Sequence, residues 1–248
     1  YGGVSVSYAY RDWVDFSVNG TYYSWIVRNG VLVAGDMSFI KPLLYFFTGQ
    51  PLIGKFNTRG IEGYYCTDRE EANAKAKRFL TPGCTISWGG SETLLEIGLI
   101  DDLMESDYTL YDRASAVTPE EKREMYGKIV TSDVYFMSSN AITLDGELVN
   151  IDGAGNRVAC LCHGPQQVIV IAGMNKIVPD VRSGIARVHN MAAPPNSLRL
   201  GLKTPCAQYG RCADCLSSDC ICAQTVVTRF SRIPDRIKVI LVGEELGF

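Results

Sequence analysis

Val168-Ile169-Val170-Ile171-Ala172 is a continuous run of apolar residues, and it decides the fold class. A strand with one face in water alternates apolar and polar side chains, whereas a strand covered on both faces is apolar throughout. Val134 to Met137 and Ile237 to Val242 are predicted as strands of the same buried kind. The three runs predict a sheet that is covered on both sides.

Helices and further strands alternate along the chain around these runs. Helices are predicted from the capping box Thr67-Asp68-Arg69-Glu70 to Leu80, over Glu92 to Leu103, from Thr118-Pro119 onward, and over Val178 to Asn190. Strands are predicted over Cys84 to Trp88, Tyr108 to Tyr111 and Thr225 to Phe230. This order predicts an α/β protein with a mostly parallel, Rossmann-like sheet and an antiparallel patch around Ala141 to Cys162.

The first 53 residues have a different texture. They are rich in aromatic residues and poor in charge, and Val4 to Tyr10 alternates polar and apolar residues. Asn29-Gly30 predicts a hairpin turn between Trp25–Val27 and Val31–Val33. We expect residues 1–53 to form an atypical β-rich segment, either an appendage of the main domain or a foreign piece of a barrel-type protein. Residues 54–248 form the main domain.

Composition excludes several classes of function. The 248-residue chain has a net charge of −3, which disfavours a dominant nucleic-acid surface. It contains no apolar run of the roughly 20 residues that a membrane helix needs, and no secretory signal of the usual form. Clustered cysteines are typical of a reducing compartment. We therefore expect a cytoplasmic protein without nucleic-acid or membrane partners.

Five of the nine cysteines lie between Cys206 and Cys222. Two residues separate Cys212 from Cys215, and this spacing lets one turn present both thiolates to a metal. Four thiolates suit an iron–sulfur cluster or a structural zinc. The spacing matches neither a bacterial ferredoxin run nor a standard zinc ribbon, so both metals stay open. A third possibility is a set of free or oxidised thiols in a polar loop.

A strand, two glycines and a helix follow one another at Ser87 to Thr93. Backbone N–H groups at such a junction favour an anion, and glycine allows a ligand to come close to the backbone. The residues concerned are Gly89, Gly90, Ser91, Glu92 and Thr93. The same junction also occurs for packing reasons alone.

Further polar residues follow the predicted buried strands, where α/β proteins bind ligands. We predict that a polar ligand contacts Asn140, Glu147, Asn150, Asp152, Arg157 and Lys176. The competing interpretation is turn chemistry, because Asn, Asp and Gly are common in tight turns. It accounts well for Asp145-Gly146 and Asp152-Gly153, and less well for Asn140 and Arg157. For Lys176, a solvated first-turn lysine is the alternative.

Several motifs resemble those of the LUD-domain (lactate utilisation) family. They are Ser87 to Leu94 with Glu96 to Leu99, Asn140 to Thr143 with Asp145 to Asn150, Gly173 to Val178, and Val242 to Phe248. They occur in the expected order between Gly54 and Phe248. The chain is most similar to the stand-alone branch with a C-terminal cysteine motif, and its first fifty residues do not fit the family.

The resemblance implies a fold of the NagB/RpiA/CoA-transferase type, with an anionic ligand at the loop Gly89 to Thr93. It implies four cysteine ligands, which map onto Cys206, Cys212, Cys215 and Cys222, with Cys220 as an extra. It also implies a part in oxidising lactate to pyruvate, with an iron–sulfur cluster of the 4Fe–4S kind and other lactate-utilisation subunits as partners.

Three functions are therefore weighed. The favoured one is an iron–sulfur redox component of lactate oxidation that binds a small anionic acid. The second is a ligand-binding or transferase enzyme for a phosphorylated or CoA-type ligand, with a structural zinc. The third is a non-catalytic regulatory subunit. Whether the chain alone is an enzyme is left open.

Overall fold

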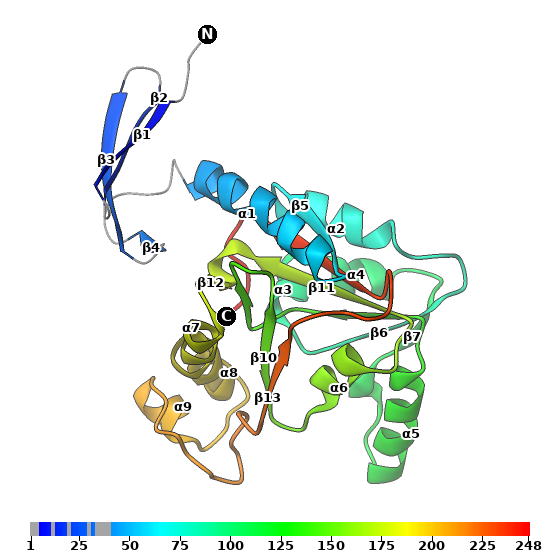
Figure 1. Ribbon diagram of the computed structural model, residues 1–248. Coiled ribbons are helices and arrows are strands. Elements are labelled where there is room, and N and C mark those ends of the chain that lie inside the picture. Colours follow the sequence, from blue (N-terminus) through cyan, green and yellow to red (C-terminus); the bar gives the residue numbers. More distant parts are fainter. Residues whose placement is uncertain (1–4, 11–12, 19–20, 29–30, 33–40) are drawn as a thin grey trace. The chain divides into compact units, whose positions relative to one another are not determined.

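The computed structural model describes residues 5–10, 13–18, 21–28, 31–32 and 41–248, with side chains from Tyr45 onward. It divides into two compact units, Tyr1–Lys41 and Pro42–Phe248. Figure 1 shows the chain with its helices and strands labelled. Each unit is described by itself.

The first unit contains a four-stranded antiparallel sheet. Its strands β1 (Ser5–Tyr10), β2 (Trp13–Val18), β3 (Thr21–Arg28) and β4 (Val31–Leu32) pair in chain order. The predicted β-rich character is therefore confirmed for these residues. β3 and β4 pair as expected of a hairpin, while the turn Asn29-Gly30 lies outside the described residues.

Helix α1 (Lys41–Thr58) runs through the expected boundary between residues 53 and 54. Leu52 and Phe56, on either side of that boundary, are both buried in the core of the second unit. The main domain therefore includes this helix, and we place its start at Pro42. Residues 45–47 are aromatic, like the β-rich segment before them. The sequence therefore did not reveal that they belong to a helix that packs on the sheet.

The second unit is built on a six-stranded sheet in which all neighbouring strands are parallel. In spatial order the strands are β5 (Glu62–Cys66), β14 (Ile237–Val242), β11 (Gln167–Gly173), β8 (Val134–Met137), β6 (Thr85–Trp88) and β7 (Thr109–Tyr111). The apolar runs of β11 and β8 lie in the middle of this order, and β14 lies beside β11. The predicted α/β, mostly parallel sheet is confirmed.

Alternate side chains of these strands enter two separate cores. Val168, Val170 and Ala172 of β11 pack with α1, α5 (Pro119–Val130) and α6 (Asn156–Cys162). Ile169 and Ile171 pack on the other face with α2 (Arg69–Lys77), α3 (Glu92–Glu96) and α4 (Leu99–Met104). Helices thus cover both faces, which explains the unbroken apolar run.

Two helix predictions need correction. The predicted helix from Glu92 to Leu103 is interrupted at Gly98, whose φ of 71° ends α3 and begins α4. Only glycine adopts this left-handed conformation without strain. At α2 the capping residue is Asp68 rather than Thr67, and it accepts a hydrogen bond from the N–H of Glu71. The helix start predicted at Thr118-Pro119 is confirmed, and the structure shows a full capping box there, formed by Thr118 and Glu121.

A second, small sheet has the order β12 (Ile177–Val178), β9 (Ala141–Thr143), β10 (Leu148–Asp152) and β13 (Gln224–Thr228). It contains the predicted antiparallel patch, but the patch ends at Asp152 because α6 begins at Asn156. Cys160 and Cys162 therefore lie on a helix, where Cys160 is buried and Cys162 is exposed.

The segment predicted as one helix from Val178 to Asn190 begins instead at Val181, behind an Asp180 cap. Its helix α7 (Val181–Arg187) continues through a π-helical turn, η3 (Val188–Ala192), into α8 (Ala193–Arg199). A short helix α9 (Pro205–Tyr209) leads into the cysteine loop. Figure 1 shows α7, α8 and α9 grouped beside the small sheet.

Candidate functional site

A cavity of about 250 Å³, here called the polar pocket, lies at the carboxyl ends of the parallel strands. Gly90 follows β6, Ser138 follows β8, and Lys176 ends the 3₁₀ turn η2 (Met174–Lys176) that follows β11. Helix α8 and Ile221 of the cysteine loop also line it. Of the predicted ligand-binding residues, the pocket brings together Gly90, Ser91, Glu92, Thr93, Asn140, Asp152, Arg157 and Lys176.

Lys176 is the buried cation of this pocket. Its side-chain nitrogen Nζ donates hydrogen bonds to Thr93 Oγ1 and Ser138 Oγ, both at 2.9 Å, and the residue is only 4% exposed. Within residues 45–248 no carboxylate pairs with it. The pKa of Lys176 is lowered to about 7, first by burial and then by the positive charges of Arg187 and Arg157, while Glu96 acts in the opposite direction.

The segment around Gly247 packs over Lys176. Gly247 has a φ of 58°, and a Cβ atom there would lie 2.7 Å from Thr93 Oγ1 and 3.3 Å from Lys176 Nζ. Its N–H donates to Glu96 Oε2 at 2.7 Å, which fixes the segment on α3. A side chain at position 247 would push into the Lys176 environment, so glycine leaves that nitrogen the room to sit where it does.

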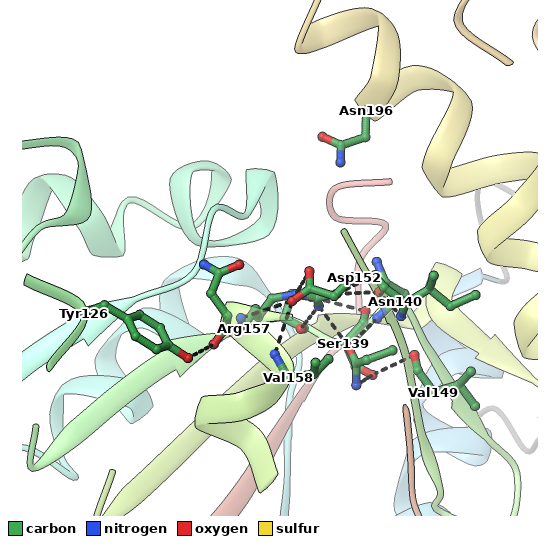
Figure 2. Close-up of polar contacts among 12 residues, drawn as sticks. Tyr126, Ser139, Asn140, Val149, Asp152, Arg157, Val158 and Asn196 are labelled. Atoms are coloured by element: carbon green, nitrogen blue, oxygen red, sulfur yellow. Dashed lines mark hydrogen bonds and ion pairs between the residues drawn. The ribbon is translucent and has the colours of Figure 1, made fainter. Parts of the chain in front are cut away.

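Arg157 has a structural role rather than a free guanidinium. One terminal nitrogen, Nη1, donates to Ser138 O and Asn150 Oδ1, and the other, Nη2, donates to Asn140 Oδ1 and Ile151 O, at 2.7 to 3.1 Å. Figure 2 shows the hydrogen bonds around Arg157, with Asn140 and Asp152 beside it. Because its donors are occupied, Arg157 holds the strand ends in position.

Asp152 and Asn150 belong to the same network. Asp152 Oδ2 accepts hydrogen bonds from the N–H groups of Arg157 and Val158, at 3.0 and 3.3 Å, and so caps the first turn of α6. Asn150 is fully buried and does not line the pocket. Its side chain bonds to Arg157 and to Ser139 Oγ. Through these hydrogen bonds, Asp152 and Asn150 hold the strand ends and the start of α6 in position.

Gly89 and Glu147 do not reach the pocket either. Gly89 lies under it, where its N–H donates to Phe136 O. Glu147 sits on the hairpin between β9 and β10, with its carboxylate 3.6 Å from Arg59 Nη1 and beside Thr143. Turn chemistry, the alternative to ligand binding, therefore describes Glu147 better.

Glu92 reaches across the pocket to α8. Its Oε1 lies 3.0 Å from Arg199 Nη1, and Arg199 also donates to Asn196 Oδ1. Figure 2 shows Asn196 on α8, facing the Arg157 network across the cavity. The ion pair therefore ties the α8 wall to the strand–helix junction, and we assign Glu92 to closing the pocket.

Sequence reasoning missed several residues in and around the pocket, among them Ser138, Arg113 and Arg187. Ser138 directly follows the buried strand β8, so the rule that found Asn140 also applied to it. Arg113 lines the pocket from η1 (Arg113–Ser115), and no pattern in the sequence indicated this. Arg187 lies behind the pocket and donates to Asn140 O and Asn175 O; burial lowers its pKa.

The five clustered cysteines lie within electrostatic reach of one another. The pKa of the Cys222 thiol is raised to about 12 by burial and then by Cys220, Cys212, Cys206 and Cys215. All five thiols are free. Across the part of the chain that is described, no three Cys, His, Asp or Glu side chains are arranged to hold a metal ion. The loop thus brings the five thiols near one another, but it does not place them in a metal-binding arrangement.

A scan of protein-family models matches the LUD domain over residues 50–242. The chain belongs to the LUD-domain family. The predicted family is confirmed, and membership supports a lactate-utilisation-type protein. No curated protein matches the chain. In residues 41–248 no helix combines the length and the apolar character that a membrane span requires.

Among solved structures, the LUD-domain chain is similar to a DUF162 family protein from Deinococcus radiodurans. The match has 12% identity and a TM-score of 0.49, and covers 80% of this chain and 98% of that one. It is also similar to ribose 5-phosphate isomerase from Plasmodium falciparum, at 17% identity and a TM-score of 0.29, over 45% and 52% of the two chains.

Proposed function

We propose that the polar pocket binds a small carboxylate of the 2-hydroxy- or 2-keto-acid class, such as lactate or pyruvate. The observation that carries this proposal is Lys176, a buried cation whose Nζ makes two hydrogen bonds to hydroxyls and no carboxylate contact within residues 45–248. A buried charge without a counter-ion is costly. A bound carboxylate would supply the missing charge.

The pocket also offers groups that suit the rest of such an acid. The side-chain nitrogen of Asn140 has no partner among the described residues, because only its Oδ1 is used by Arg157 and Ile151. The hydroxyl of Ser91 makes no capping bond on α3. Arg113 adds a second positive charge at the wall. These groups can donate hydrogen bonds to a carboxylate and to a hydroxyl or keto oxygen at once.

We further propose that the protein is an iron–sulfur redox component in the oxidation of lactate to pyruvate. The donor set supports a cluster by its chemistry, because thiolates are the ligands of such clusters and five of them share one loop. The ligands would be Cys206, Cys212, Cys215 and Cys222. When bound, a cluster would accept and pass single electrons. The loop has to close to bring these thiols together.

The cysteine loop and the polar pocket share a wall. Ile221, between Cys220 and Cys222, lines the pocket, and its Cα lies 3.2 Å from where a Cβ of Gly153 would be. A change in the loop would therefore alter the pocket. The chain's own contribution is to bind the acid, orient its carboxylate on Lys176 and keep it next to this loop.

Strictly anaerobic purification followed by iron, sulfide and zinc analysis tests the redox part. We expect about four iron and four sulfide per chain with broad visible absorbance, lost in Cys212→Ser and Cys215→Ser. The exposed Cys162, outside the loop, provides the control, and Cys162→Ser keeps the metal. Bleaching by added L-lactate in the presence of partner subunits would support the direction of electron flow.

Other results would point elsewhere. About one zinc per chain and no colour would make the loop structural and favour the enzyme with a phosphorylated or CoA-type ligand. Protein that holds neither metal in both the wild type and Cys162→Ser would contradict a redox role and favour a regulatory subunit.

A further inference from the structure

A second cavity of about 400 Å³ adjoins the polar pocket and plays no part in the function proposed above. It lies between the end of β6, the turn η1 and helix α5. Its wall is largely aromatic and apolar. The large side chains that line it are Trp88, Met125, Tyr126 and Tyr135. We call it the aromatic cavity.

The two cavities meet at Arg113 and Asn156, which line both of them. Arg113 lies so close to the backbone of Gly90 that a Cβ there would be 2.4 Å from its Nη2. Tyr126 donates its hydroxyl to Asn156 O at 3.4 Å and so holds the other side of the junction. The positive charge of Arg113 thus lies where the aromatic cavity meets the polar pocket.

Hydrogen-bond donors of this cavity are unused. In residues 45–248 no partner is found for the Arg113 guanidinium, the Lys122 ammonium, the Trp88 indole N–H or the Tyr135 hydroxyl. Burial raises the pKa of Tyr135, so its hydroxyl stays a neutral donor. Among the residues whose side chains are described, no Asp or Glu lines the cavity. The lining therefore combines flat apolar surfaces with positive charge and free donors.

We propose that the aromatic cavity binds a nucleotide, with the planar heteroaromatic ring between Trp88 and Tyr126 and the phosphate on Arg113 and Lys122. Flat rings stack on aromatic side chains, and a guanidinium pairs with two phosphate oxygens at once. Lys176 and Asn140 of the polar pocket stay available for a small acid, and Arg113, which lines both cavities, is a group that the two proposals share.

Calorimetric titration of the full chain with AMP and with FMN tests the proposal, because each carries a planar ring and one phosphate. Adenosine and riboflavin, which lack the phosphate, should bind about tenfold more weakly, since a charge-assisted hydrogen bond contributes roughly that much. Inorganic phosphate alone should bind more weakly still, because it cannot use the aromatic wall.

Two variants and a control give the test its specificity. Arg113→Met should weaken the nucleotide that binds by about tenfold or more. Ala114→Trp, at an exposed alanine of the cavity wall, should abolish binding by filling the space while the fold stays intact. Arg123→Met removes a neighbouring exposed arginine of α5 that lines neither cavity, and it should bind like the wild type.

Failure of both AMP and FMN to bind would overturn the inference, and so would binding that is unchanged in Ala114→Trp. L-Lactate titrated into Ala114→Trp separates the two proposals. Retained lactate binding with lost nucleotide binding is the expected pattern. Nucleotide binding that is lost only in Lys176→Met would place the ligand in the polar pocket and contradict a second site.

Discussion

The two ends of the central sheet differ in how their buried positive charges are paired. At the amino end, Lys238 pairs with Glu62 at 3.1 Å, and Arg236 donates to three backbone carbonyls. At the carboxyl end, Lys176 is also buried, and its partners within residues 45–248 are two hydroxyls. The amino end is satisfied by the fold itself, whereas the carboxyl end is left with positive charge that a ligand can complete. We propose that the charges at the amino end stabilise the fold and that the unpaired charge at the carboxyl end binds a ligand.

The largest effect on stability is expected at Arg236. Its guanidinium is the donor to Cys160 O, Leu161 O and Pro165 O, in a position that is 6% exposed. Arg236→Met leaves three buried carbonyls without a donor and should lower the free energy of unfolding by about 3 kcal/mol. Urea denaturation measures this. A change below about 0.5 kcal/mol would show that the amino end is not held in this way.

The next largest effect on stability is expected from the two buried lysines, Lys238 and Lys176. Lys238→Met removes the ion pair with Glu62, whose carboxylate keeps the hydrogen bond from the Tyr64 hydroxyl, and should cost about 1–2 kcal/mol. Lys176→Met removes a charge that has no counter-ion, so we expect stability to stay the same or to rise slightly. The same denaturation series compares them. Equal losses in both variants would mean that Lys176 is as well satisfied as Lys238.

Binding of pyruvate should weaken as the pH rises through about 7. The reason is that the lowered pKa of Lys176 makes its amine neutral above that value, and a neutral amine no longer attracts a carboxylate. Arg187, Arg157 and Glu96 are the charged groups that act on the Lys176 amine. By linkage, the protein should take up protons on binding at pH 7.5.

Calorimetry in two buffers of different ionisation enthalpy measures that uptake. The uptake should vanish in Lys176→Met. A dependence on pH that persists in this variant would assign the titration to another group and would break the link between the carboxyl end and the anion.

The smallest effect concerns the ion pair between Glu92 and Arg199. Both side chains are partly exposed, so Glu92→Gln should change stability by no more than about 0.5 kcal/mol. We expect the ligand to dissociate a few times faster, because α8 is tied less firmly across the pocket. Stopped-flow measurement of dissociation tests this, with Glu124→Gln on α5 as the control, since Glu124 pairs only with Lys128.

The sequence predicted the central sheet well because the apolar runs of β8 and β11 arise from burial on both faces. It failed where one residue overrides a pattern. Gly98 breaks an otherwise periodic helix through its left-handed conformation, and the expected boundary at residues 53–54 falls within α1, where Leu52 and Phe56 pack on the sheet. Local spacing carries no information about such tertiary contacts.

The sequence predicted that several polar residues would meet in one place, but it did not predict what each of them contacts. Residues after β6, β8 and β11 do meet in one pocket, because parallel strands end at the same edge. Arg157 and Asn150 looked like ligand contacts, yet they bind each other and the strand ends. Which polar residue is consumed by the fold depends on partners far away in the sequence, and Arg113 could not be found for the same reason.

The most direct test of the account is calorimetric titration of pyruvate and L-lactate into the wild type, Lys176→Met and Lys238→Met at pH 6.5. We predict that the acid binds the wild type and Lys238→Met with similar affinity, and that Lys176→Met binds at least about tenfold more weakly. Equal affinity in all three proteins would contradict the claim that the unpaired cation at the carboxyl end of the sheet is the anion site.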